Sequence, residues 1–261
     1  MRGRGMITVA GVSKAFHTKG KSALVLDNVS FQVERGEIVT LLGKSGCGKS
    51  TLLNMVGGFL PPDNGTVLLD GKEVIRPTKR CVMLFQQRNL LPWRTVLKNV
   101  ELGLEGEAMP AADKRERVME ALRLVGLDGH EHQFPHELSG GMQQRVAIAR
   151  AFAIQPDVIL MDEPFAALDT FNRYNLQDEL IRIQTQKKTT ILLVTHDIDE
   201  AVYLSDRVLI MSSHPGRIYN EMLIKQSKPR DRTHGDFHYY RKKILEEFEL
   251  SGVQPMPEYS I

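Results

Sequence analysis

The most informative part of the sequence is Gly43-Lys44-Ser45-Gly46-Cys47-Gly48-Lys49-Ser50-Thr51. The stretch fits the spacing G-x-x-x-x-G-K-S/T, which is typical of a backbone loop that binds phosphate groups. The nearly continuous apolar run before it, Glu37–Leu42, predicts a strand buried on both faces. A helical pattern begins at Ser50. Because the motif needs a strand before it and a helix after it, a chance glycine-rich turn is a poor explanation.

Each residue type in this phosphate loop (Gly43–Thr51) suits a nucleotide. The glycines let the backbone turn with its N–H groups pointing inward, where they form a nest for phosphate oxygens. The following helix adds the positive end of its dipole. Lys49 is placed to reach the β- and γ-phosphates, and the Ser50 hydroxyl suits Mg²⁺, which prefers oxygen ligands. We interpret Cys47 as a small residue that fits the loop, not as a redox group.

Outward from the phosphate loop, the hydrophobic pattern predicts an α/β protein. The N-terminal part has β-type runs broken by turn signals such as Asp70-Gly71. These runs are Met6–Phe16, Leu26–Val33 and Thr66–Val74. After Pro156, strands alternate with helices, which predicts a parallel sheet covered on both faces. The strands are Val158–Met161, Thr190–Thr195 and Arg207–Met211, and the helices pass through Leu176–Ile183 and Ile198–Leu204.

The middle of the chain predicts a helical insert between these two parts. Asp113–Val125 has an amphipathic helical pattern that Gly126 can end. Met142–Ala153 predicts a second helix, which stops before Pro156. One more helix is expected over Arg241–Phe248, near the end of the chain.

The composition excludes several classes of protein. The 261 residues, 42% of them hydrophobic, suffice for one or two folded domains. The 34 basic and 32 acidic residues leave a net charge of +2, which argues against a nucleic-acid partner bound by electrostatics. No apolar run approaches the roughly 20 residues of a membrane-spanning helix, and the basic residues 1–5 do not form a secretory signal. Cys47 and Cys81 predict reduced thiols in a cytoplasmic protein.

Two adjacent acids follow the apolar run Val158–Met161. A strand that ends in Asp162 and Glu163 delivers carboxylates to the edge where open α/β sheets bind ligands. There, Asp162 would hold Mg²⁺ and Glu163 would orient or deprotonate the attacking water. The alternative is that both acids cap the next element and face solvent.

With these residues in place, the chain resembles the ATP-binding subunit of ABC transporters. The most specific match is the signature Leu138-Ser139-Gly140-Gly141-Met142-Gln143-Gln144-Arg145. Further matches are the Q-loop glutamine Gln86, the D-loop Ala167-Leu168-Asp169, the switch histidine His196 and the adenine-stacking position Phe16. The resemblance covers about residues 6 to 220. For Phe16 the alternative is a core phenylalanine.

The resemblance implies a P-loop NTPase (RecA-like) parallel-sheet core with an N-terminal antiparallel β region and an α-helical subdomain insert. The expected division is a single ABC ATPase domain over residues 1–261. Its nucleotide-binding core would be residues 1–86 and 151–220, its helical subdomain residues 87–150, and residues 221–261 a C-terminal tail whose role is not readable.

The resemblance also implies how the site residues act on ATP and Mg²⁺. Two copies of the chain would sandwich two ATP molecules, and the signature residues Ser139, Gly140, Gly141 and Met142 would serve the ATP of the other copy. Mg²⁺ would be held by Ser50, Gln86 and Asp162. The catalytic set would be Lys49, Gln86, Glu163 and His196, with Asp169 in the D-loop.

Two segments resemble importers for nitrate, taurine and alkanesulfonates: Gln87–Asn99, which holds the single tryptophan Trp93, and Ser213–Arg217. Trp93 is expected either to contact a partner or to lie in the core. The resemblance implies an ATPase peripheral to the cytoplasmic face of the membrane, working with permease subunits and indirectly with an extracytoplasmic solute-binding protein. The alternative is the ATPase of an exporter or lipid-extracting system.

Two other clusters are expected to carry no site. His130, His132 and His136 lack a nearby fourth zinc ligand, so a solvated loop is the expected structure. Arg241-Lys242-Lys243 lies next to Glu246 and Glu247, which favours a solvated helix face over a lipid contact.

Overall fold

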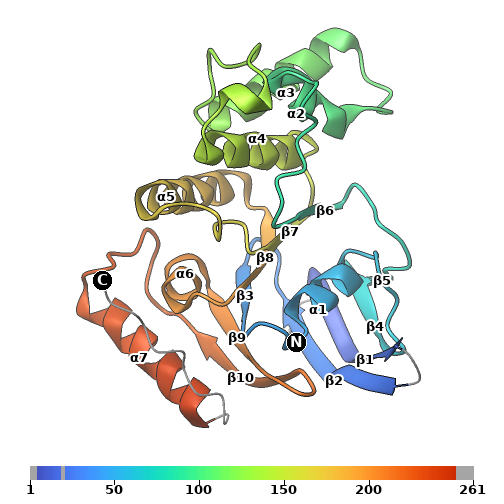
Figure 1. The fold of residues 1–261 in the computed structure, drawn as a ribbon, viewed down its shortest axis with the longest axis vertical. Helices are drawn as coiled ribbons and strands as arrows, with labels where there is room; N and C mark the ends of the chain where they lie inside the picture. Colours follow the sequence, from blue (N-terminus) through green and yellow to red (C-terminus); the bar gives the residue numbers. More distant parts are fainter. Residues whose placement is uncertain (1–4, 19–20, 251–261) are drawn as a thin grey trace. The chain divides into compact units, whose positions relative to one another are not determined.

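The computed structural model describes residues 5–18 and 21–250 of the chain (Figure 1). Most of the basic N-terminal segment and the end of the predicted tail lie outside the described residues. The chain forms two compact units, residues 1–77 with 190–261 and residues 78–189. These bounds differ from those of the expected core and helical subdomain, and that division stays a prediction.

The first unit contains an antiparallel sheet built from the N-terminal part of the chain. Its strands are β1 (Ile7–Thr18), β2 (Lys21–Val33), β4 (Asn64–Leu69) and β5 (Lys72–Glu73), in the order β2-β1-β4-β5. The predicted turn Asp70-Gly71 joins β4 to β5, and both of its residues have positive φ. The expected N-terminal antiparallel region is therefore confirmed.

A second group of strands in this unit carries the parallel core. The buried strand β3 (Ile38–Leu42) pairs in parallel with β8 (Thr190–Thr195) and with β9 (Arg207–Ser212). At the far side of β9, β10 (Arg217–Leu223) pairs antiparallel. Helix α1 (Lys49–Val56) packs near β8, and α6 (Ile198–Leu204) packs on β3 and β8.

The part of the tail that the structure describes is folded onto this unit. Helix α7 (Gly235–Leu250) begins six residues before the expected helix and lies beside α6 and β9 (Figure 1). Its Phe237 and Ile244 are buried. Arg241, expected on a solvated face, forms an ion pair of 2.8 Å with Asp199 of α6. The basic cluster is thus partly used for packing.

The second unit combines two parallel strands with the helical part of the chain. Strand β6 (Cys81–Leu84) pairs with β7 (Val158–Asp162). Helix α4 (Gly140–Ala153) packs against α2 (Val96–Glu101), α3 (Ala111–Leu124) and α5 (Thr170–Lys187). Short 3₁₀ turns cover Leu102–Leu104 and Pro135–Glu137. In the described part of the chain, no helix combines the length and apolar character needed to cross a bilayer.

Candidate nucleotide-binding site

The phosphate loop lies where the sequence places it, between β3 and α1 of the first unit. All five residues of β3 are buried, and α1 begins at Lys49. Gly48 has φ +97°, and a Cβ on it would lie 2.6 Å from Leu26 Cδ2. Because both the backbone angle and the space exclude a side chain, this position requires glycine.

The ammonium group of Lys49 lies at the centre of this loop. Its Nζ donates hydrogen bonds to the carbonyl oxygens of Gly43 at 2.6 Å and Lys44 at 2.8 Å. The side chain is only 5% exposed, whereas Ser45, Gly46 and Ser50 are exposed. The loop therefore holds a buried, hydrogen-bonded cation next to residues that are exposed to solvent. This arrangement suits a phosphate chain that enters from solvent.

Cys47 belongs to the interior of the phosphate loop. Its Sγ lies 3.9 Å from Lys49 Nζ, and a Cβ on Gly43 would lie 2.7 Å from the sulfur. Burial raises the pKa of the Cys47 thiol. Burial also raises the pKa of Cys81 to about 12. Both cysteines are free and buried, and the raised pKa of each disfavours the reactive thiolate, in agreement with the interpretation of Cys47 as a packing residue.

The switch-histidine position lies at the same edge of the core as the phosphate loop. The parallel register pairs Leu42 of β3 with Thr195 of β8, so Gly43 and His196 leave neighbouring strands at the same level. His196 is exposed, and the next residue, Asp197, caps α6 by accepting a hydrogen bond from the N–H of Glu200 at 3.0 Å. The first unit thus holds both the loop and the histidine.

Phe16 stands on β1 with its ring accessible. It pairs with Ala23 of β2, and its side chain is 41% exposed. The alternative of a core phenylalanine is therefore wrong. An accessible ring face is what stacking on a base requires.

In the second unit, the two parallel strands bring the predicted acids and the Q-loop glutamine to one edge. The register pairs Leu84 with Met161, so Gln86 follows one strand and Asp162 and Glu163 end or follow the other. Glu163 has φ +46°. A non-glycine residue in this region is strained, and such strain is concentrated at functional sites, where it re-aims a side chain.

The signature residues form the N-terminus of α4. Ser139 is the N-cap, and its Oγ accepts a hydrogen bond from the N–H of Met142 at 3.3 Å. A Cβ on Gly140 would lie 3.1 Å from a guanidinium nitrogen of Arg88. An arginine beside the positive end of a helix dipole strengthens the attraction for an anion. Arg88 lies in the segment Gln87–Asn99 singled out from the sequence, but the sequence alone assigned it no role.

The D-loop position adjoins the signature within the same unit. Asp169 caps α5, and its carboxylate accepts hydrogen bonds from the side chain of Asn172 at 2.6 Å and from its N–H at 3.1 Å. These bonds lower the pKa of Asp169. A Cβ on Gly141 would lie 3.4 Å from Asn172, which therefore links the D-loop to the signature. The capping aspartate three residues ahead is the signal that could have identified Asn172.

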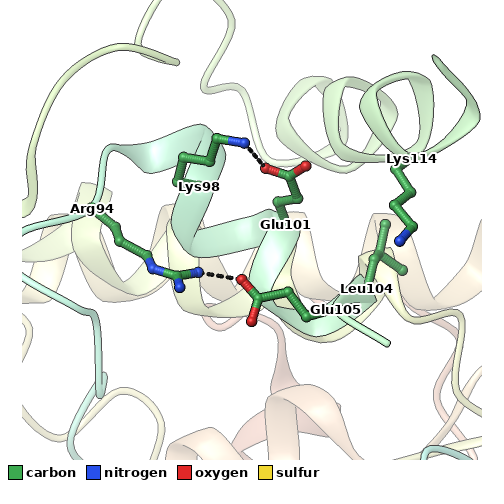
Figure 2. Close-up of a pocket in the computed structure, with 6 residues that line it drawn as sticks. All are labelled: Arg94, Lys98, Glu101, Leu104, Glu105 and Lys114. Carbon is green, nitrogen blue, oxygen red and sulfur yellow. Dashed lines mark hydrogen bonds and ion pairs between the residues drawn. The ribbon is translucent and has the colours of Figure 1, made fainter. Parts of the chain in front are cut away.

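A small pocket of the second unit lies outside these residues (Figure 2). It has a volume of about 250 Å³ and is lined mainly by charged side chains that pair with one another, Arg94 with Glu105 and Lys98 with Glu101. Trp93, next to it in the sequence, is 72% exposed, so the core alternative for Trp93 is wrong. Among the described residues, no cluster of histidine, cysteine or acidic side chains could hold a metal ion.

Comparison with known proteins decides the family. A family model described as ABC transporter matches residues 26–166, more than half of the chain. The chain belongs to the ABC transporter family. The predicted family and the predicted P-loop NTPase fold are thereby confirmed, and the chain is an ABC ATPase.

Relatives and a solved structure extend this result. The chain is 45% identical to the aliphatic sulfonates import ATP-binding protein SsuB of Bacillus cereus, over 95% of this chain and 97% of that protein. It is 43% identical to the nitrate transport protein NasD of Klebsiella oxytoca, over 92% and 95% of the two chains. A solved dimer of an ATP-binding cassette in a post-hydrolysis state with ADP and phosphate has a TM-score of 0.74 and 33% identity, and covers 85% of this chain and 100% of that one. The roles of single residues stay predictions.

Proposed function

We propose that this ABC ATPase binds Mg·ATP at its phosphate loop and uses hydrolysis to drive uptake of a small oxyanion through a membrane permease. The observation that carries the proposal is the buried Lys49 ammonium, hydrogen-bonded at the centre of a glycine loop between a buried strand and a helix. The ammonium and the inward N–H groups would neutralise the charge of the β- and γ-phosphates.

The side chains that would hold Mg²⁺ all offer oxygen. Ser50 contributes a hydroxyl, Gln86 an amide oxygen and Asp162 a carboxylate, and none of the three is buried. This donor set suits a hard divalent cation, which would withdraw charge from the phosphates when bound.

Hydrolysis needs a base and a group that holds the transition state. Glu163, on its strained backbone after β7, is the proposed base that takes a proton from the attacking water. His196, directly after β8, is the proposed partner of the transferring phosphate. Asp162 ends the buried strand β7, Glu163 directly follows it, and both are partly buried, which argues against the alternative of two solvated capping acids.

In the proposed mechanism, a second copy of the chain completes each ATP site. The signature, with Ser139 as cap and Arg88 nearby, offers an anion site on the N-terminus of α4. We propose that it contacts the γ-phosphate of the ATP held by the other copy, and that Asp169 lies at the same surface. The solved cassette dimer supports this pairing.

The proposed cargo and location come from the relatives. Their names refer to aliphatic sulfonates and to nitrate, which share a small, singly charged oxyanion group. We therefore propose that the chain lies at the cytoplasmic face of the membrane, against permease subunits that receive solute from an extracytoplasmic binding protein. Exposed Trp93 is the proposed contact of the second unit with the permease.

The test of this proposal separates binding from hydrolysis. In Glu163→Gln, ATP affinity should match the parent while turnover falls at least about 100-fold, the usual effect of losing a general base. Calorimetry with Mg·ATP and phosphate release measure the two quantities. Glu73→Gln, on exposed β5, is the matched control and should leave both unchanged. Parental turnover in Glu163→Gln would remove Glu163 from the mechanism.

A second experiment tests the cargo. The chain would be reconstituted in vesicles with a candidate permease and a candidate solute-binding protein. Nitrate or a short alkanesulfonate should stimulate ATP hydrolysis and enter the vesicles. Outward movement of lipid or solute, with no stimulation by these anions, would replace import with the exporter alternative.

A further inference from the structure

The turn between β9 and β10, residues 213–216, lies against the backbone of the phosphate loop. A Cβ on Gly216 would lie 2.1 Å from the carbonyl oxygen of Cys47. Real Cβ atoms do not approach another heavy atom so closely, so any side chain here must displace the loop or the turn. Gly216 is not among the residues with positive φ, so the requirement for glycine at this position comes from the lack of space.

Two backbone hydrogen bonds between β2 and Gly216 hold this turn in place. The N–H of Gly216 donates to the carbonyl of Val25 at 2.8 Å, and the N–H of Asp27 donates to the carbonyl of Gly216 at 3.0 Å. The next side chain, Arg217, donates from Nε to the carboxylate of Asp27 at 3.0 Å. The turn is therefore held at a fixed distance from β2.

The same segment of β2 also touches the phosphate loop. Leu26 is fully buried, and its Cδ2 would lie 2.6 Å from a Cβ on Gly48 and 3.1 Å from one on Gly216. Leu26 thus contacts the α-carbon positions of both glycines. The Cys47–Gly48 peptide therefore has the turn beside its carbonyl oxygen and Leu26 of β2 beside Gly48.

The orientation of this peptide matters for a phosphate ligand. A trans peptide is planar, and its C=O and N–H point in opposite directions. Because the carbonyl of Cys47 points at Gly216, the N–H of Gly48 points away from the turn. In a loop that binds phosphate through its N–H groups, this orientation must be fixed before the ligand arrives.

We propose that Gly216 is a positioning residue for ATP binding, because it leaves space for the Cys47 carbonyl and so orients the Cys47–Gly48 peptide of the phosphate loop. The inference rests on the proposed function and adds to it a turn about 170 residues away in sequence. Arg217 and Asp27 support the turn from its exposed side.

The test compares two glycine-to-alanine variants of the full chain. Gly216→Ala adds a methyl group against Cys47, whereas the control Gly235→Ala adds the same group where nothing lies within 4 Å. Calorimetry with Mg·ATP should show affinity at least about fivefold weaker for Gly216→Ala, as expected of an overpacked contact. The control should bind as the parent does.

Site-resolved alkylation of the nucleotide-free protein supplies a readout that general destabilisation does not mimic. Gly216→Ala should raise the labelling rate of Cys47 while that of Cys81, buried in the other unit, stays at the parental value. An equal rise at both cysteines would show general loosening and would overturn the proposal.

A further variant covers the case in which Gly216→Ala does not fold. Arg217→Ala removes the tie to Asp27 without adding volume, and should weaken ATP binding about twofold and raise Cys47 labelling alone. Parental values for both would overturn the proposal. If the parent binds ATP and Gly216→Ala binds it equally well, only this inference fails; if the parent itself does not bind ATP, the proposed function fails with it.

Discussion

The chain carries two glycine-containing loops that each precede a helix, and they are built differently. The phosphate loop is enclosed: Lys49 is buried, and a Cβ on Gly48 would lie 2.6 Å from a neighbouring side chain. The signature is open: Ser139 is exposed, and a Cβ on Gly141 would make an ordinary contact of 3.4 Å. One loop contains its own cation, and the other has a hydroxyl cap with an arginine at its side.

The difference in enclosure gives a physical reason why the two proposed anion sites would act on one ligand without competing for it. An enclosed loop with a fixed charge is preorganised and can bind a triphosphate alone. An open helix end, capped by its own serine, offers a weaker field and needs a second surface that brings the anion to it. The two loops should therefore respond differently to the loss of a charge, an added methyl group and the loss of a cap.

The largest effect is expected from removing the enclosed cation. Lys49→Ala should weaken Mg·ATP binding by roughly 30- to 150-fold, because charge-assisted hydrogen bonds to the phosphates are worth about 2–3 kcal/mol. Calorimetry measures the affinity, and Lys72→Ala on exposed β5 is the control for loss of a lysine. Parental affinity in Lys49→Ala would contradict a role of this loop in binding.

Adding one methyl group should destabilise the fold at the phosphate loop but not at the signature. Gly48→Ala should cost about 1–3 kcal/mol, because it meets both a positive φ and the buried Leu26. Gly141→Ala, in the first turn of α4, should be neutral or stabilising by up to about 1 kcal/mol, since alanine is the better helix former. Denaturant unfolding measures both. Equal losses would show that the signature is as tightly enclosed as the phosphate loop.

The fold was predictable wherever burial is continuous or periodic within one element. The runs that became β3, β8 and α6 have apolar patterns that need no distant partner to be recognised. Sequence reasoning missed α2, because six residues are too few for a helical period. It also missed β10, whose half-polar residues form a strand through pairing with β9.

The candidate site shows the same difference between local sequence motifs and contacts that join distant segments. The phosphate loop, the acids and the signature are local motifs, so their spacing identified them. The contacts of Arg88 with Gly140 and of Gly216 with Cys47 join segments far apart in sequence, and no local pattern encodes them. Asn172 has a local signal in its cap Asp169, but its contact with Gly141 has none. The sequence of Ser213–Arg217 resembles the importers, but the resemblance gives no physical reason for the segment. The packing of Gly216 against Cys47 supplies the proposed reason, which is to orient the phosphate loop.

A smaller effect is expected from the open loop. Ser139→Ala should cost about 1 kcal/mol of stability through the lost cap. ATP affinity of the single chain should be unchanged, whereas turnover at high protein concentration should fall. Thr95→Ala is the matched control, because Thr95 caps α2 in the same way by accepting from the N–H of Lys98. If both cap variants lose turnover equally, the loss reflects helix stability and not a role in the other copy's site.

The smallest effect concerns the carboxylate next to the signature. The hydrogen bonds from Asn172 lower the pKa of Asp169 in the folded chain, so the ionised form stabilises the fold. This contribution is fully present above the unfolded pKa of about 3.9 and is lost as the pH falls through the lower folded pKa. Asp169→Asn keeps a good cap but removes the charge, so its melting temperature should lie slightly below that of the parent at pH 7.

The pH dependence distinguishes this charge effect from a packing change at Asp169. The difference in melting temperature between parent and Asp169→Asn should shrink as the pH falls below about 4, because the unfolded chain takes up the proton first and the folded carboxylate follows at lower pH. Asp128→Asn, an exposed acid on the loop after α3, controls for the general loss of one negative charge. A difference that stays constant with pH would mean that the Asn172 hydrogen bonds stabilise the D-loop through geometry alone, with no contribution from the charge of Asp169.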